Sequence, residues 1–322
     1  MTYANKKAIL KFGVIMIVGV VVASAMSTGV LADAPAESAY SDILNNTDGD
    51  GTLSNPYVLT TLEELQAMNG SLSAHYVLAN NIDASETENW NNGAGFTPIG
   101  NGSEFSGNFD GKGFSVDGLY IYRPNTNAVG LFDSISSDII NISVTNIDIQ
   151  GGRYVGGLVG FIKGGDSGAN IEKSYSSGSV SGDSSVGGLV GYNRDNSNIY
   201  YSYSNSNVSG TSEVGGLVGS NSRYITNSYS TGSVTGNTFV GGLVGYNRDA
   251  GTVVDSYWNT ETSTQSTSAG SAIGLTTAEI TGSAASTNMV GFDFTSVWST
   301  VLATDIDSSA DSYPILDENH LL

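Results

Sequence analysis

The stretch Val186-Gly-Gly-Leu-Val-Gly-Tyr-Asn193 decides how this chain folds, because its first six residues occur four times. Each copy is followed further along the chain by a Ser-Tyr pair, and a weaker copy begins at Val129. Repetition at a period of this length indicates one supersecondary unit stacked along an axis. The copies begin at Val155, Val186, Val214 and Val240, so they lie 31, 28 and 26 residues apart.

Short runs of Val, Ile and Tyr bounded by Gly, Ser and Asn predict strands rather than helices. Identical residues at identical positions in every unit favour stacking of each strand on its copy in the next unit. We therefore expect an all-β fold, a parallel β-helix whose coils lie about 4.8 Å apart. Four residues before each tyrosine, the matched positions hold Ile171, Ile199, Ile225 and Val253.

Such stacking predicts two ladders of like side chains along the axis. Aromatic rings in one ladder would lie over one another. Side-chain amides in the other can donate to one neighbour and accept from the next. The paired glycines are expected to allow a sharp bend or close packing, with a change of side-chain parity near them. The ladders comprise Tyr175, Tyr203, Tyr229 and Tyr257, and Asn193, Asn221 and Asn247.

The string at 186–193, repeated at 240–247, resembles the GLUG-repeat family of secreted and surface proteins of bacteria and archaea. Family-like segments extend the resemblance over roughly residues 48–316. It implies a β-helical stalk or adhesin-like module. Some larger members also carry a protease domain, which nothing in this chain matches. The further segments are Phe105 to Gly113, Ser256 to Thr262, Phe292 to Trp298 and Tyr313 to Leu316.

The first 32 residues have the layout of a secretory signal. Lys6, Lys7 and Lys11 precede an apolar run from Phe12, and small residues end at Ala32. This pattern predicts cleavage before Asp33 and an extracellular or cell-surface location. The alternative is an uncleaved anchor through residues 12–32, which would be the chain's one contact with a membrane.

Composition narrows the classes of partner. The chain has no cysteine, so it has neither disulfides nor a bacterial lipoprotein attachment site. After residue 32 there are 8 Lys and Arg against 31 Asp and Glu, a formal charge of −23. Nucleic acid and anionic lipid require a basic surface, so this charge argues against both. It suits solubility in salt or the binding of cations.

The domain organisation follows from the repeats. We expect a linker and capping helix at 33–75, the β-helix at 76–260 with its regular coils at 129–260, and a C-terminal cap and tail at 261–322. A capping box at Thr61 to Glu64 predicts a helix that covers the first coil. A second box at Thr276 to Glu279 opens a short helix expected to help close the last coil, together with Phe292, Phe294, Trp298 and Tyr313.

Few residues point to catalysis. The two histidines, His75 and His320, lie far apart and outside any metal-binding spacing, so structural roles are favoured for both. No Gly-x-Ser-x-Gly elbow and no phosphate-binding Gly-Lys-Ser/Thr sequence is present. We therefore expect no catalytic set, no metal site and no cofactor.

Carboxylates are the remaining candidates. Asp195 and Asp249 occupy matched positions after Tyr192 and Tyr246, two coils and roughly 9.6 Å apart. That separation is near the upper end for an inverting glycosidase pair. A local ion pair with the preceding arginine is the favoured alternative. These four residues are the candidate ligand-binding set.

Two motifs suggest surface chemistry. Asn46 to Gly51 resembles the start of an EF-hand loop but lacks the glutamate at position 12, where Tyr57 stands, so an Asp-Gly turn is favoured. N-glycosylation sequons also occur, and the one at Asn141 is expected to be buried. The others are Asn45, Asn69, Asn101 and Asn207.

Three functions remain open. A non-enzymatic surface or secreted β-helix that presents a lateral face to a glycan or protein is favoured, because the coils are regular and no catalytic set is evident. A polysaccharide lyase or glycoside hydrolase using Asp or Glu on one face is the main alternative. A cation-dependent envelope component is the third.

Overall fold

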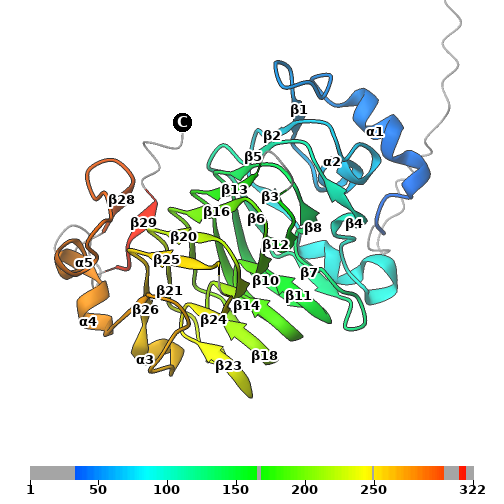
Figure 1. Ribbon diagram of the computed structural model, residues 1–322. Helices are drawn as coiled ribbons and strands as arrows, with labels where there is room; N and C mark the ends of the chain where they lie inside the picture. Colours follow the sequence, from blue (N-terminus) through cyan, green and yellow to red (C-terminus); the bar gives the residue numbers. More distant parts are fainter. Residues whose placement is uncertain (1–32, 165–167, 249, 301–311, 317–322) are drawn as a thin grey trace, which may run out of the picture. The chain divides into compact units, whose positions relative to one another are not determined.

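The structure, a computed structural model, describes residues 33–164, 168–248, 250–300 and 312–316. The expected signal or anchor at residues 1–32 lies outside this range, as do His320 and Asp249. Three sheets of parallel strands wrap around one interior, and successive coils run side by side (Figure 1). The predicted parallel β-helix is confirmed.

The strands repeat in the order sheet 1, sheet 2, sheet 3 from coil to coil. Sheet 1 contains β1 (Tyr57–Leu59), β2 (Tyr76–Leu78), β5 (Phe109–Asp110), β9 (Ile139–Ile140), β13 (Ala169–Glu172), β16 (Ser197–Tyr200), β20 (Tyr224–Thr226) and β25 (Thr252–Val254). Sheet 3 contains β4 (Ile99–Phe105), β8 (Phe132–Ile135), β12 (Val159–Ile162), β15 (Val190–Asn193), β19 (Val218–Asn221) and β24 (Val244–Asn247).

Sheet 2 has the most strands, because several coils enter it twice on either side of a bend. It contains β3 (Ile82–Asp83), β6 (Ser115–Asp117), β7 (Tyr120–Tyr122), β10 (Ser143–Gln150), β11 (Arg153–Gly156), β14 (Tyr175–Gly187), β17 (Tyr203–Ser204), β18 (Asn207–Gly215), β21 (Tyr229–Ser230), β22 (Val234–Thr235), β23 (Thr238–Gly241), β26 (Tyr257–Asn259) and β27 (Ile273–Leu275). The parallel sheets thus run from Tyr57 to Leu275, beyond both limits of the expected 76–260 span.

Strand register matches the sequence repeat residue for residue. Val129 pairs with Val155, Val155 with Val186, Val186 with Val214, and Val214 with Val240. The isoleucines of sheet 1 also stack in register and are buried. Each coil therefore repeats the interior of the coil before it, which is what like-on-like stacking requires.

The glycines of the repeat are explained by close approach. A Cβ on Gly187 would lie 2.1 Å from the Val190 carbonyl oxygen, and one on Gly188 would lie 2.0 Å from Ser204 Oγ. Neither glycine has a positive φ, so contact rather than unusual backbone geometry selects them. The expected parity change lies next to them, because Leu189 and Val190 are adjacent and both fully buried.

Helices cap the N-terminal end of the stack, as expected (Figure 1). In α2 (Leu62–Ala67), Thr61 Oγ1 accepts from the Glu64 N–H, and the Glu64 carboxylate accepts from the Thr61 N–H. The apolar face of α2 joins the main core. The other N-terminal helical segments are η1 (Glu37–Ala39), α1 (Tyr40–Asn46), η2 (Met68–Gly70) and η3 (Ser85–Gly93).

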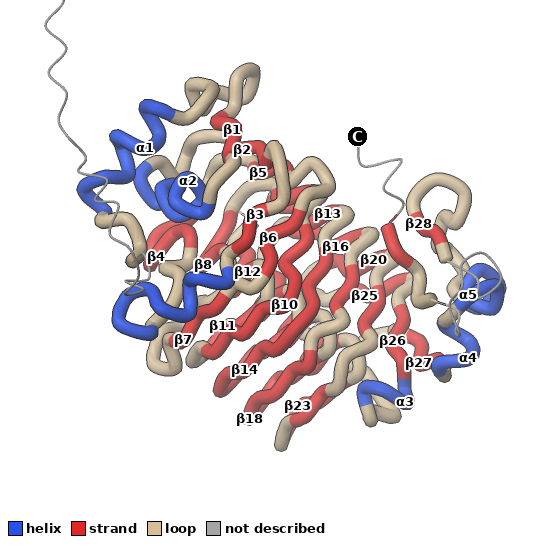
Figure 2. Tube along the Cα trace, turned by 180° about the vertical axis from the view of Figure 1, so that it is seen from behind, coloured by secondary structure: helices blue, strands red, loops and turns tan. Residues whose placement is uncertain are grey.

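Trp258 fills the core of the last coil. It lies in register with Ser230, so a large ring occupies the position that a small serine takes in the coil before. Its side chain is buried in the main core, and its Nε1–H donates to the Gln265 carbonyl oxygen at 3.0 Å. The chain continues through α3 (Thr260–Ser263), β27, α4 (Thr277–Ile280) and α5 (Gly282–Asn288), seen at the opposite end from α1 in Figure 2.

The C-terminal aromatic residues do not close the last coil, contrary to expectation. Phe292, Trp298 and Tyr313 pack instead on the outside of sheet 2, against Tyr203, Tyr229 and Tyr257. This second apolar cluster is distinct from the main core. It is held by a two-residue antiparallel pairing of β28 (Trp298–Ser299) with β29 (Ile315–Leu316).

Candidate ligand-binding face

The tyrosine ladder lies on the outer side of sheet 2 and is covered. Tyr175 and Tyr203 stack at 4.5 Å between ring centroids, and Tyr203 and Tyr229 stack at 4.9 Å. Tyr257 stays in register, but its ring packs edge-on against Phe292. The Tyr229 hydroxyl donates to the Pro314 carbonyl oxygen, and burial holds the pKa of Tyr229 well above its usual range. The ladder is therefore an attachment surface for the C-terminal segment.

The asparagine ladder lies inside the coil, at the end of sheet 3. Asn193 Nδ2 donates to Asn221 Oδ1 at 2.8 Å, and Asn221 Nδ2 donates to Asn247 Oδ1 at 2.8 Å. The hydrogen-bonded ladder is thus confirmed. Earlier coils place Ile135 and Ile162 at this position, so the amides replace an apolar column.

The coil also contains a third ladder, of serines, which was not predicted because serine was expected only at the ends of strands. The serine before each ladder tyrosine is fully buried. Its hydroxyl accepts the backbone N–H of the matching residue one coil earlier, which is a serine in three cases and Ile142 in the first coil of the ladder. Each hydroxyl donates to the carbonyl oxygen two residues before it. The recurrence of serine directly before each repeated tyrosine was the sequence signal that could have predicted this ladder. The members are Ser174, Ser202, Ser228 and Ser256.

Two corners of the coil use left-handed backbone at non-glycine residues. One corner directly precedes Ile142 and the four serines of the third ladder, at Asn141, Lys173, Tyr201, Asn227 and Asp255. The other directly precedes the repeated valine, with φ between 50° and 60°, at Ala128, Tyr154, Ser185, Glu213 and Phe239. This conformation is unfavourable for bulky side chains. Aromatic residues at the second corner therefore hold their rings outward at a cost in stability.

Those rings form part of an aromatic strip along sheets 2 and 3, which we define as Tyr154, Phe161, Tyr192, Tyr246 and Phe239. Tyr154, Phe161 and Tyr192 lie 5.4 to 5.6 Å apart. At the other end, Phe239 and Tyr246 lie 4.9 Å apart, and Phe239 is 59% exposed. The strip crosses four coils, about 14 Å of the axis.

Arg248 fills the gap in the strip. The coil between Tyr192 and Tyr246 carries Ser220 at the matched position, which leaves space beside the rings. The Arg248 guanidinium carbon lies 5.0 Å from the Tyr192 ring centroid and 5.1 Å from that of Tyr246. Its Nε donates to Ser220 Oγ at 3.1 Å, and its Nη2 lies 3.4 Å from Glu213 Oε1. The strip is thus continuous, and the positive charge within it is matched by a carboxylate.

The structure therefore brings together two of the four predicted ligand-binding residues, Tyr192 and Tyr246. Asp195 does not join them in a groove. It is half-buried, and its Oδ1 lies 3.5 Å from Arg194 Nε, the local ion pair that was the favoured alternative. Asp249 lies outside the described residues, so the proposed carboxylate pair has one described member.

Other candidate chemistry has structural explanations. His75 Nδ1 accepts the Asn108 N–H from the next coil at 3.0 Å. Asp50 of the EF-hand-like loop accepts from the Thr52 N–H and hydroxyl, which lowers its pKa and closes a turn. In the described part of the chain, no cluster of three or more His, Asp or Glu side chains is arranged to hold a metal ion.

The sequons differ in access. The amides of Asn45 and Asn101 are on exposed residues, and Asn207 is exposed with its Oδ1 accepting from Ser233. Asn69 is half-buried, with Nδ2 donating to the Gln66 and Thr97 carbonyl oxygens. Asn141 is also half-buried, and its Nδ2 donates to Asp110 Oδ1.

Residues 182–209 and 210–235 match the family described as the GLUG motif. Residues 182–235 therefore carry two GLUG motifs. They include Ser202 and Ser228 of the third ladder and the corner residues Ser185 and Glu213. Halomucin from Haloquadratum walsbyi is 38% identical over 150 residues, which cover 44% of this chain and 2% of that protein. A protein named as a Gly-rich membrane protein from Evansella cellulosilytica is 33% identical over 120 residues, covering 35% of this chain and 14% of the relative. The chain thus spans a small part of the length of either relative.

A solved structure from Bacteroides ovatus shares the fold of this chain. It is described as an immunoglobulin A1 protease and superposes with a TM-score of 0.62, covering 84% of this chain and 94% of that one. The two sequences are 18% identical, so the likeness concerns the fold alone. No helix in the described residues has the length and apolar character needed to cross a bilayer.

Proposed function

We propose that this GLUG-repeat chain is a non-enzymatic secreted or cell-surface protein that presents the aromatic strip to a glycan or protein partner. The main support is that Tyr154 and Phe239 adopt left-handed backbone, where a smaller residue would make the fold more stable. Exposed aromatic rings on a rigid frame bind at a low cost in conformational entropy.

Charge and relatives support this location and role. The strip's Arg248 is paired with Glu213, and the chain as a whole is strongly acidic, which disfavours nucleic acid as the partner. One relative is named as a membrane protein, which supports a place in the cell envelope. The segment at residues 1–32 supports export by its composition.

A variant at Phe239 tests the proposal sharply. Phe239→Asn removes the most exposed ring of the strip and puts in a residue that adopts left-handed backbone readily, so the variant is expected to unfold at the same temperature or higher. Binding to glycan and protein arrays should fall at least about tenfold. Ala128→Asn is the matched control, because it changes the same corner position in another coil and removes no ring.

Two results would contradict this proposal. Unchanged partner binding by Phe239→Asn would show that the strip is not the binding surface. Turnover in a broad polysaccharide panel, abolished by Asp195→Asn, would establish the carbohydrate-active alternative instead. The mass of the protein recovered from its host tests export, because cleavage after Ala32 and glycan additions change it by known amounts.

A further inference from the structure

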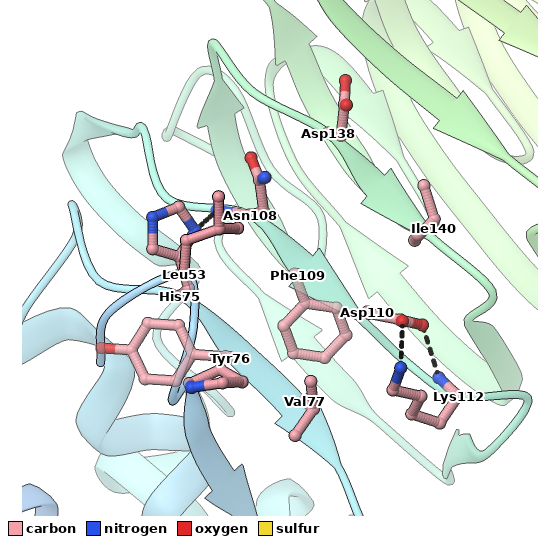
Figure 3. A pocket seen from close by; sticks show the side chains of 11 residues that line it. Leu53, His75, Tyr76, Val77, Asn108, Phe109, Asp110, Lys112, Asp138 and Ile140 are labelled. Atoms are coloured by element: carbon pink, nitrogen blue, oxygen red, sulfur yellow. Dashed lines mark hydrogen bonds and ion pairs between the residues drawn. The ribbon is translucent and has the colours of Figure 1, made fainter. Parts of the chain in front are cut away.

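A hollow lies on the outer face of sheet 1, away from the aromatic strip (Figure 3). It has a volume of about 470 Å³, within the range of small-molecule sites. The outward-facing residues of β2, β5 and β9 form its base, and Leu53 and Pro56, in the loop before β1, form one wall. Leu53 is 70% exposed, so its side chain is accessible to a ligand in the hollow.

Three polar side chains form a row across the hollow, one from each coil, as Figure 3 shows for His75, Asn108 and Asp138. The Asn108 N–H donates to His75 Nδ1, so the neutral ring carries its proton on Nε2, a donor without a partner among the described residues. Asp138 Oδ1 accepts two hydrogen bonds from Asn170, both at 2.9 Å, and Oδ2 has no protein partner among the described residues. The row thus offers a donor, an amide and an acceptor.

A second row is mainly apolar. Val77, Asp110 and Ile140 lie in register on the same three strands. The Asp110 carboxylate is occupied by Lys112 Nζ at 2.8 Å and by Asn141 Nδ2 at 3.0 Å. Its charge is therefore matched, and the remaining surface of this row is the branched side chains of Val77 and Ile140.

We propose that this hollow binds one or two sugar units of a neutral glycan. A hydroxyl group can accept from His75 Nε2–H and donate to Asp138 Oδ2, and neighbouring hydroxyls of one ring can reach neighbouring coils. The C–H face of the ring packs on Val77 and Ile140. An anionic ligand is disfavoured, because Asp138 carries the one unmatched charge of the hollow. The site is independent of the aromatic strip.

Binding of neutral trisaccharides of glucose, galactose and mannose to the full chain, followed by saturation-transfer NMR and calorimetry, tests the site. Asn108→Ala and Asp138→Asn should each weaken binding about tenfold. Neither is expected to disturb folding, because the Asn108 amide has no side-chain partner in the described residues and Asn at 138 can still accept from Asn170. Melting temperatures check this.

A control separates the site from the rest of the surface. Thr226→Ala alters the same face of sheet 1 beyond the hollow, so it should bind the trisaccharides like the parent chain. Equal or tighter binding of a uronic acid trisaccharide would overturn the assignment. Binding of short peptides alone, or of nothing at millimolar concentrations, would overturn it as well.

Discussion

Replacing Asn221 with isoleucine tests whether the asparagine ladder stabilises the coil as a unit. Isoleucine fits the position, because Ile135 and Ile162 occupy it in earlier coils. The change removes four hydrogen bonds, to Asn193, Asn247 and the Arg223 N–H and carbonyl oxygen. At about 1 kcal/mol net each, the loss is about 4 kcal/mol, and buried polar atoms are left without partners.

The triple replacement of Asn193, Asn221 and Asn247 by isoleucine should behave differently. It removes both partners of each inter-coil bond, and replacing both partners by apolar groups can be nearly neutral. We therefore expect the triple variant to lose less than twice what Asn221→Ile loses. Urea denaturation followed by circular dichroism gives both free energies of unfolding. Additive losses over the three single variants, or a loss below about 1 kcal/mol for Asn221→Ile, would refute the reasoning.

Three further changes probe other parts of the fold. Gly188→Ala should lower the free energy of unfolding by more than about 3 kcal/mol, since its Cβ would clash with backbone and Ser204 Oγ. Gly93→Ala is the control, because its Cβ meets open space at φ +82°, and it should cost about 1 kcal/mol. Thermal melting measures both. Trp258→Ala should lower the free energy of unfolding by about 3 to 5 kcal/mol, because it empties the core of the last coil. Burial raises the pKa of Tyr229, so the folded chain keeps a proton that the unfolded chain loses above about pH 10. Stability should therefore fall as pH rises through that range, and Tyr229→Phe should reduce the fall; an identical alkaline profile would contradict this.

Sequence reasoning predicted the features that depend on the same residue recurring at the same position. The register of the repeated valines, the stacked tyrosines and the hydrogen-bonded asparagines all follow from identity between copies, because parallel coils place like over like. The capping box at Thr61 was predictable for a similar reason, since its chemistry is local.

The remaining features depend on contacts that no periodicity encodes. The Arg248 position required knowing that Ser220 leaves a gap between two rings. The burial of Phe292 and Trp298 could be predicted from their apolar side chains. The sequence does not indicate whether these side chains cover the end of the stack or its side. The hollow at His75 joins residues from three coils that share no sequence motif.

The left-handed corner at Tyr154, Ser185, Glu213 and Phe239 separates two kinds of constraint on evolution. Its bend is set by backbone and by the glycines beneath it, so the same corner accepts the buried Ser185, the acidic Glu213 and the outward-facing rings of Tyr154 and Phe239. New surface chemistry can therefore arise by single substitutions at one position per coil. A protein built this way can change what it recognises while its scaffold stays the same.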